Sequence, residues 1–97
     1  MREPNFEWDE AKAASNLQKH GVSFEDAATV FRDERGLLIR DPESPDDDER
    51  FILMGLNAQL RLLVVVHGYR SNDDVIRIVS ARRANRSESR QYATVNR

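Results

Sequence analysis

The chain has 97 residues, of which 39% are hydrophobic and 33% are charged, and its formal net charge at pH 7 is −2. These values are typical of one small folded domain over residues 1–97 and argue against intrinsic disorder. The sequence has no cysteine, which excludes disulfides, cysteine-ligated zinc and thiol catalysis. It has no apolar run close to the roughly 20 residues of a membrane span. Because the first residues lack a signal-peptide apolar region, we expect a cytoplasmic protein without membrane contact.

The net charge conceals an asymmetry between the two halves of the chain. Residues 1–49 contain 6 Lys/Arg and 14 Asp/Glu, whereas residues 50–97 contain 9 and 3, and all nine of these basic residues are arginine. The planar guanidinium suits bidentate contacts with phosphate or carboxylate. The basic half therefore either faces phosphate groups or complements the acidic half, within the fold or across a subunit contact, and the sequence leaves both open.

Two helices are predicted in the first third of the chain. Asp9 is a suitable N-cap for a helix over residues 10–20, which Gly21 ends, and its apolar stripe is narrow. Ser23 caps a second helix with a wider apolar stripe, which ends at residues 33–36. The preceding stretch from Phe6 to Trp8 is either an edge strand or an N-terminal anchor.

Strand patterns follow at residues 37–39, 51–56, 62–66 and 75–80. The third is a run of five apolar residues, which fits a central strand covered on both faces. Short connections predict an antiparallel meander, and Ser87 is a candidate cap for a last helix that contains Tyr92. The fold class is therefore α+β, with two N-terminal helices, a four-stranded antiparallel sheet, with or without a short N-terminal edge strand, and a C-terminal helix.

Residues 41–49 form an acidic loop with two prolines, which we expect to be solvated. The aspartates at 46–48 lack the spacing and the turn glycine of a calcium loop. We therefore expect no metal site and no cofactor.

Several motifs recur here in a familiar order. They are F-x-W-D at 6–9, K-H-G-V-S-F-E-D-A at 19–27, V-F-R-D at 30–33, E-R-F at 49–51, L-L-V-V-V-H at 62–67, V-I-R-I-V-S-A-R-R-A at 75–84 and E-x-x-x-Y at 88–92. Together they resemble the BrnT family of toxins from bacterial type II toxin–antitoxin systems, over nearly the whole chain. One position departs from the pattern, because Ser89 follows Glu88 where such proteins often have arginine.

The resemblance implies a RelE-like fold and an endoribonuclease that inhibits translation by cutting RNA. It also implies a BrnA-like antitoxin, whose DNA-binding part would bring the complex to its promoter, so that the toxin contacts DNA only indirectly. A homodimer or a toxin–antitoxin heterotetramer is compatible with it.

Metal-independent RNA cleavage needs a base, an acid and cations at the phosphate. His67 ends the central strand, and antiparallel pairing brings Glu49 and Arg50 near it, which makes these three catalytic candidates. Arg77 joins them as an RNA contact if its side chain faces the same way. The alternative is that His67 is a strand-end histidine held by hydrogen bonds.

Arg82 and Tyr92 form a second catalytic group, since related toxins use sheet arginines and an aromatic residue of the last helix. Tyr92 can equally anchor that helix. Arg83 and Lys19 are further RNA-contact candidates, but Arg82 and Arg83 must point to opposite sides of an extended strand. The dipole of the first helix alone would account for Lys19.

Two other functions fit the sequence. The chain could be a non-catalytic protein- or DNA-binding module that acts with a partner encoded beside it, or a small sheet protein that only dimerises. The acidic pI near 5.7 favours the non-catalytic binding module, because tight non-specific binding of nucleic acid is not expected at this pI.

Overall fold

The computed structural model describes residues 4–70, 72 and 74–97. The described elements, in chain order, are β1 (Asn5–Glu7), α1 (Glu10–His20), α2 (Phe24–Thr29), the 3-10 turn η1 (Val30–Arg32), β2 (Leu37–Arg40), β3 (Phe51–Leu56), β4 (Leu62–Arg70), β5 (Val75–Arg83) and α3 (Arg86–Val95). The α+β fold class is confirmed. Of the turn expected between the two long strands, residues 71 and 73 lie outside the described part. No helix in that part is long and apolar enough to cross a membrane.

Five strands form one sheet in the order β1-β5-β4-β3-β2. The predicted antiparallel meander from β2 to β5 is confirmed. The N-terminal stretch is a fifth strand, and it pairs in parallel with β5, so that Glu7 lies opposite Arg77. Both long strands extend further than the sequence suggested, and His67 and Tyr69 therefore lie within β4 rather than beyond it.

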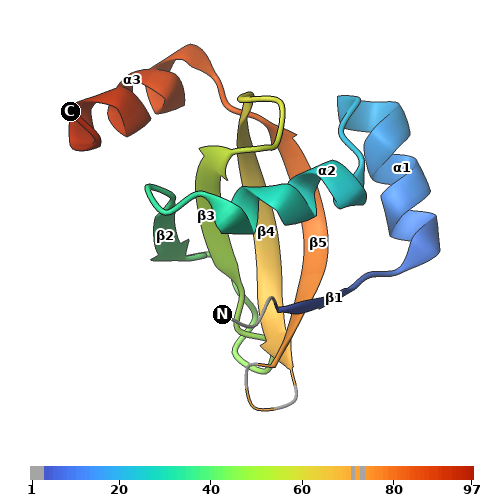
Figure 1. Cartoon of the computed structure of the whole chain (residues 1–97). Helices are drawn as coiled ribbons and strands as arrows, with labels where there is room; N and C mark the ends of the chain where they lie inside the picture. The colour runs from blue at the N-terminus through green and yellow to red at the C-terminus, as the bar shows by residue number, and fades with distance from the viewer. Residues whose placement is uncertain (1–3, 71, 73) are drawn as a thin grey trace.

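The two N-terminal helices cover one face of the sheet. Helix α2 crosses the faces of β3, β4 and β5, and α1 lies beside β5 (Figure 1). The side chains between them form the hydrophobic core, with Phe24, Val65 and Ile78 almost fully buried. Burial of this apolar surface is the main stabilising contribution to the fold.

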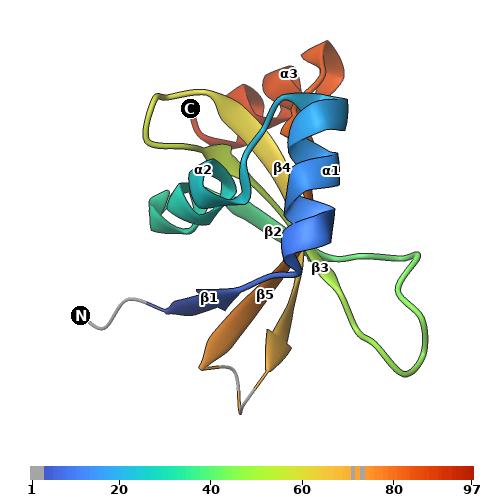
Figure 2. The same ribbon diagram turned by 90° about the vertical axis from the view of Figure 1, so that its right-hand side faces the viewer.

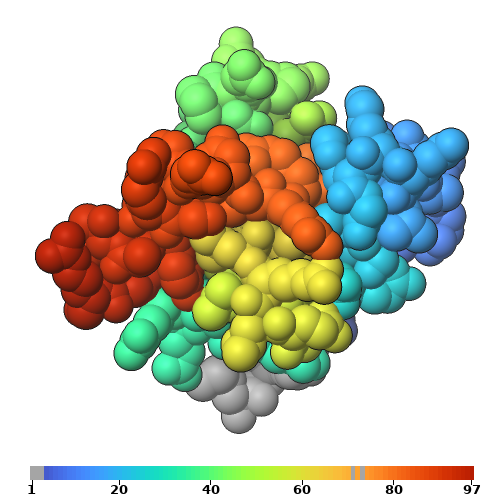
Figure 3. Space-filling model, turned by 90° about the horizontal axis from the view of Figure 1, so that it is seen from above, coloured from blue at the N-terminus to red at the C-terminus, as the bar shows by residue number. Residues whose placement is uncertain are grey.

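The opposite face of the sheet, here called the open face, has no helix packed along it among the residues that the structure describes. The acidic segment at residues 41–50 projects on this side, away from α2 (Figure 2). Seen from above, this green segment and the yellow turn near residue 60 lie on opposite sides of the molecule, and α3 extends to the left (Figure 3). The open face is therefore bordered by the acidic segment at one end and by α3 at the other.

A β-bulge between β4 and β5 determines which side chains reach each face. Val66 lies opposite Ser80, but the next residue, His67, lies opposite Ile78, so Val79 is the extra residue. The shift reverses the alternation of β5, because side-chain direction has a period of two residues.

The start and the end of α1 agree with the sequence prediction, and the start of α3 differs from it. Asp9 caps α1, and Gly21 ends it in the left-handed region with φ of 70°. The last helix is capped by Asn85 and not by Ser87. The Asn85 side chain accepts a hydrogen bond from the Glu88 amide, and Glu88 accepts one from the Asn85 amide. This reciprocal capping box satisfies two amides, which fixes the helix start two residues earlier.

Asn16 ties α1 to the sheet. Its side-chain amide donates to the carbonyl oxygens of Val22 and Ala81 and accepts from the amide of Ala81. Asn16 is only 7% exposed, whereas Leu17, which belonged to the predicted apolar stripe, is 51% exposed. The contact between α1 and β5 therefore depends on a polar side chain that the hydrophobic pattern did not indicate.

We predict that Asn16→Ala lowers the free energy of unfolding by about 2–4 kcal/mol, because it leaves buried backbone groups of Val22 and Ala81 without partners. Urea denaturation measures the change, with Gln18→Ala on the exposed face of α1 as the control, for which we expect less than about 0.5 kcal/mol. Equal midpoints for the two variants would contradict the assignment.

Candidate functional site

His67 lies in an aromatic cluster beneath the helical layer. Its ring is completely buried and contacts the rings of Phe31, Phe51 and Tyr69, with centroids 4.7, 6.2 and 5.2 Å away. Burial lowers the pKa of the imidazole, although a hydrogen bond to the carbonyl oxygen of Val65 acts in the opposite direction. His67 is therefore neutral at pH 7, and a substrate in solvent cannot contact it directly.

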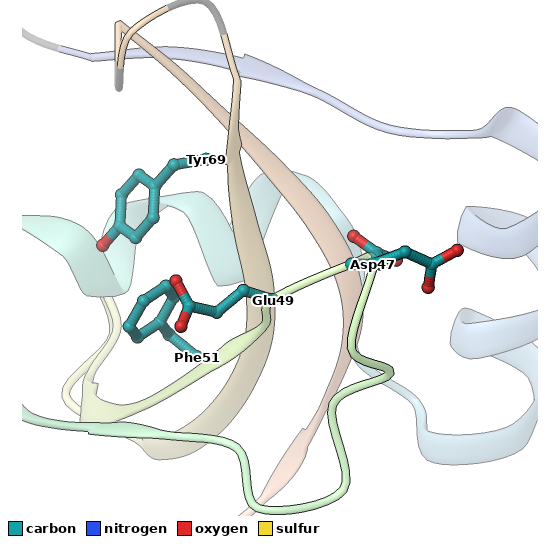
Figure 4. A pocket seen from close by; sticks show the side chains of 5 residues that line it. Asp47, Glu49, Phe51 and Tyr69 are labelled. Carbon is teal, nitrogen blue, oxygen red and sulfur yellow. The ribbon is translucent and has the colours of Figure 1, made fainter.

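Glu49 and Arg50 lie beside the end of β4, as predicted, since Phe51 pairs with His67. Their side chains, however, point to different faces of the sheet. Glu49 joins Phe51 and Tyr69 in a cavity of about 490 Å³, on the side of the helices. In Figure 4, Tyr69, Glu49 and Phe51 point to one side of the strand end, whereas Asp47 points to the other.

Arg50 belongs to a second cavity of about 280 Å³, on the open face. Four cationic side chains take part in its walls, namely Lys12, Arg50, Arg70 and Arg77, and the other lining residues are Asp47, Asp48, Gly68, Tyr69 and Val79. The four cationic side chains come from α1, from the residue before β3, and from β4 and β5. We call this set the cationic pocket. Because of the β-bulge, Arg77 faces this pocket with Arg50, so it joins only one of the three candidates, since Glu49 and His67 lie on the other side.

Carboxylates already contact the arginines of this pocket. Arg77 donates to Glu7 at 2.8 Å, and Arg70 lies 3.8 Å from the same carboxylate. Arg50 contacts Asp48 at 3.1 Å. These carboxylates occupy positions that phosphate oxygens could take, because both groups bind the guanidinium fork in the same way.

Arg82 lies on the open face but far from the cationic pocket. Arg77 and Arg82 lie opposite Gly68 and Val64, four positions apart on β4, which corresponds to about 13 Å. Both terminal nitrogens of Arg82 donate to Glu88, at 2.8 and 2.9 Å. This pair lowers the pKa of Glu88 and raises that of Arg82. It connects β5 to the first turn of α3.

Tyr92, one turn after Glu88, anchors α3 to the residue that follows η1. Its hydroxyl donates to Asp33 at 2.6 Å, and the same carboxylate oxygen accepts from the amide of Leu56. Burial and this bond raise the pKa of Tyr92 to about 12. Burial alone would raise the pKa of Asp33, but the hydrogen bonds from Leu56 and Tyr92 hold it below its ordinary value. The anchoring alternative therefore describes the observed contact.

The remaining candidates lie outside both cavities. Arg83 is exposed and extends from the opposite side of β5 to Arg82. Lys19 is exposed in the last turn of α1, about 10 Å along the helix from Lys12. Among residues 4–70, 72 and 74–97, no three His, Asp or Glu side chains gather closely enough to hold a metal ion.

A family model matches most of the chain. Residues 8–88 match the family described as "Ribonuclease toxin, BrnT, of type II toxin-antitoxin system". The chain belongs to this family. The matched range includes all four cationic residues of the pocket, His67 and Tyr69, and it ends at Glu88, before Tyr92. As a BrnT family member, the protein is a ribonuclease toxin of the type II class.

A solved structure is also similar. The crystal structure of the Brucella abortus ribonuclease toxin BrnT shares 20% sequence identity with a TM-score of 0.66, covering 86% of this chain and 99% of that one. At this identity the likeness shows the fold alone. A search of curated proteins finds no match.

Three residues of the site were missed by the sequence analysis. Lys12 is on the N-terminal turns of α1. Tyr69 and Arg70 lie beyond the strand that the sequence predicted over residues 62–66. A strand continued through His67-Gly68-Tyr69-Arg70 would have placed Tyr69 beside His67 on one face and Arg70 on the other. Lys12 carried no sequence signal, because its position depends on how α1 packs against β5.

We predict that Tyr92→Phe lowers the free energy of unfolding by about 1–2 kcal/mol at pH 7, because it removes a short bond to a carboxylate. The bond stabilises the fold above pH 3.8, the ordinary pKa of Asp33, and is lost as pH falls further. At the other end it is intact below pH 10, the ordinary pKa of Tyr92, and is lost as pH rises through about 12.

A double-mutant cycle with Asp33→Asn isolates this bond. Denaturation of both single variants and the double variant should show strong non-additivity at pH 7 and little at pH 2. Additive effects at pH 7 would contradict the contact.

Proposed function

We propose that this toxin is an endoribonuclease that binds the scissile phosphate in the cationic pocket and cleaves RNA by metal-independent acid–base chemistry. The observation that carries the proposal is the convergence of Lys12, Arg50, Arg70 and Arg77 on one cavity of the open face. Family membership supplies the ribonuclease activity in general terms. The inhibition of translation in the cell would follow from loss of intact RNA.

The pocket suits the charge that develops in this reaction. Attack of the 2′-hydroxyl on phosphorus places additional negative charge on the phosphoryl oxygens, and preorganised cations stabilise that charge more than they stabilise the substrate. Arg50 and Arg77 are about 30% exposed, so the charge–charge interaction there is less screened than on an open surface. We assign Arg50 and Arg77 to the phosphate, with Lys12 and Arg70 at the rim.

The base has two candidates on the other side of the strand end. Glu49 lines the larger cavity, but its carboxylate contacts Arg40 at 2.7 Å and is 57% exposed. His67 is neutral and suited to accept a proton, but it is buried. Tyr69 belongs to the walls of both cavities and so connects the phosphate site with either base.

We also propose a BrnA-like antitoxin as the partner, with DNA contacted only through it. The support is membership of a type II toxin–antitoxin family, in which a protein antitoxin accompanies the toxin. Arg82, Glu88 and the apolar side chains of Ile39 and Met54 line a shallow cavity near α3, clear of the cationic pocket. An antitoxin could therefore contact the open face without entering the phosphate site.

We predict that the purified protein cleaves RNA in the presence of EDTA. Arg50→Ala and Arg77→Ala should each lower the cleavage rate about 10²-fold or more, because each removes a cation from the phosphate. Gel analysis of a labelled RNA measures the rate, and Arg61→Ala, an exposed arginine in the turn before β4, is the control with an unchanged rate.

If EDTA stops cleavage and the addition of Mg²⁺ restores it, the metal-independent chemistry is contradicted. Unchanged rates for both pocket variants, with melting temperatures equal to wild type, would contradict the location of the phosphate site.

In cells, expression of the toxin alone should arrest growth, and co-expression of the protein encoded beside it should restore growth. The Arg50→Ala variant should permit growth without the partner and still co-purify with it, since only the phosphate contact is removed. Growth arrest by this variant as severe as by wild type would contradict the role of Arg50.

A further inference from the structure

The hydrogen bonds around His67 define which of its nitrogens carries the proton. Nδ1 lies 3.2 Å from the carbonyl oxygen of Val65, and Nε2 lies 3.2 Å from the hydroxyl oxygen of Tyr69. A carbonyl oxygen only accepts hydrogen bonds, so the neutral ring must carry its proton on Nδ1. Nε2 is then an acceptor, and the Tyr69 hydroxyl donates to it.

We propose that Tyr69 takes the proton of the ribose 2′-hydroxyl and passes its own proton to His67, which serves as a base that the substrate does not touch. The proposal rests on the ribonuclease activity proposed above and identifies its base. Tyr69 is the catalytic residue of this pair, and His67 acts through it.

The proton transfers balance as follows. The O–H bond of the 2′-hydroxyl breaks and a new O–H bond forms on Tyr69, while the original Tyr69 proton moves to Nε2 of His67. The 2′-oxygen forms its bond to phosphorus, and the bond from phosphorus to the 5′-oxygen breaks. Water protonates the leaving 5′-oxygen. The proton on Nε2 then returns through Tyr69 to the hydroxide so formed, which restores the neutral pair.

The position of Tyr69 suits this role. Tyr69 takes part in the walls of the cationic pocket and of the cavity that contains Glu49, which lie on opposite faces of the sheet. Figure 4 shows its ring directed into the cavity that contains Glu49, on the same side as Glu49 and Phe51. Asp47, Asp48 and Tyr69 line both cavities, so the cavities adjoin at the end of the sheet. A nucleotide whose phosphate lies at Arg50 and Arg77 can therefore direct its ribose around this end towards Tyr69.

The surroundings of His67 suit a base of low pKa. Phe31 of η1 and Phe51 of β3 pack against it, and the β5 residue opposite it is Ile78. Burial therefore keeps the ring unprotonated at neutral pH and makes its protonated form short-lived. The charged groups at this end of the sheet line the two cavities. Asp47 and Asp48 line both of them, Glu49 lines the larger one, and Lys12, Arg50, Arg70 and Arg77 line the cationic pocket.

The test is the pH dependence of cleavage by the full-length protein acting on a short labelled RNA in excess EDTA. In the wild type, kcat should rise with pH through an apparent pKa below 6.5 and then remain level. Tyr69→Phe, which keeps the ring, should lower kcat about 10²-fold or more at pH 7, remove this rise and leave KM within about twofold. The melting temperature of the variant must lie above the assay temperature.

Glu49→Gln distinguishes the relay from the alternative base. It should retain the rise of kcat with pH, because the relay remains intact. If Glu49→Gln removes the rise and Tyr69→Phe retains it, the relay is overturned while the ribonuclease proposal stands. If the wild type leaves RNA intact at every pH, both proposals are overturned.

Discussion

The β-bulge between β4 and β5 is the constraint on which both faces of the sheet depend. On one side of the bulge Ala81 faces the core and Arg82 faces outward, and on the other side Ile78 faces the core and Arg77 faces outward. If Val79 were paired regularly instead of bulged, a single alternation along β5 would direct Arg77 into the core and Ile78 to the open face. The bulge thus keeps Arg77 and Arg82, which are five positions apart, on the same face and keeps the core apolar.

The same irregularity separates the molecule into two polar regions. Near α3, the bidentate pair of Arg82 and Glu88 and the bond from Tyr92 to Asp33 hold the last helix at the end of the sheet. At the far end, the cationic pocket lies on the open face of the sheet, and the aromatic cluster around His67 lies on the other face of the same strands. The first region is engaged in internal contacts, and the second has cavities on both faces. Structural support and candidate chemistry are therefore about 13 Å apart on one strand.

Hydrophobic patterns predicted the elements of this fold well, because they depend on local periodicity and capping. The caps at Asp9 and Ser23 and the strand pattern at residues 62–66 needed no knowledge of tertiary contacts. Asn16 was not predicted, because its role depends on a strand that lies 65 residues later in the chain. The capping box at Asn85 was missed because Ser87 offered a plausible cap two residues further on.

The candidate site was predicted less completely, and the reason is geometric. Strand pairing correctly placed Glu49 and Arg50 beside His67, but pairing alone does not state which side chains share a face. The predicted strand ended where the apolar run stops, at residue 66, so Tyr69 was left beyond it and was not among the site candidates. A bulge leaves no reliable signal in one sequence. The face of the sheet on which Arg77 lies could therefore not be predicted.

The charge asymmetry of the sequence now has a physical meaning. The two halves complement each other within the fold, because Glu7 from the acidic half contacts Arg70 and Arg77, and under the proposed function the same arginines also meet RNA. In the free protein the carboxylate of Glu7 keeps the guanidinium groups of Arg70 and Arg77 near one another in spite of their mutual repulsion. RNA must then displace a carboxylate for each phosphate contact, which reduces affinity for any single phosphate. Several contacts made together overcome this competition, so the arrangement favours an extended polyanion over a free phosphate ion.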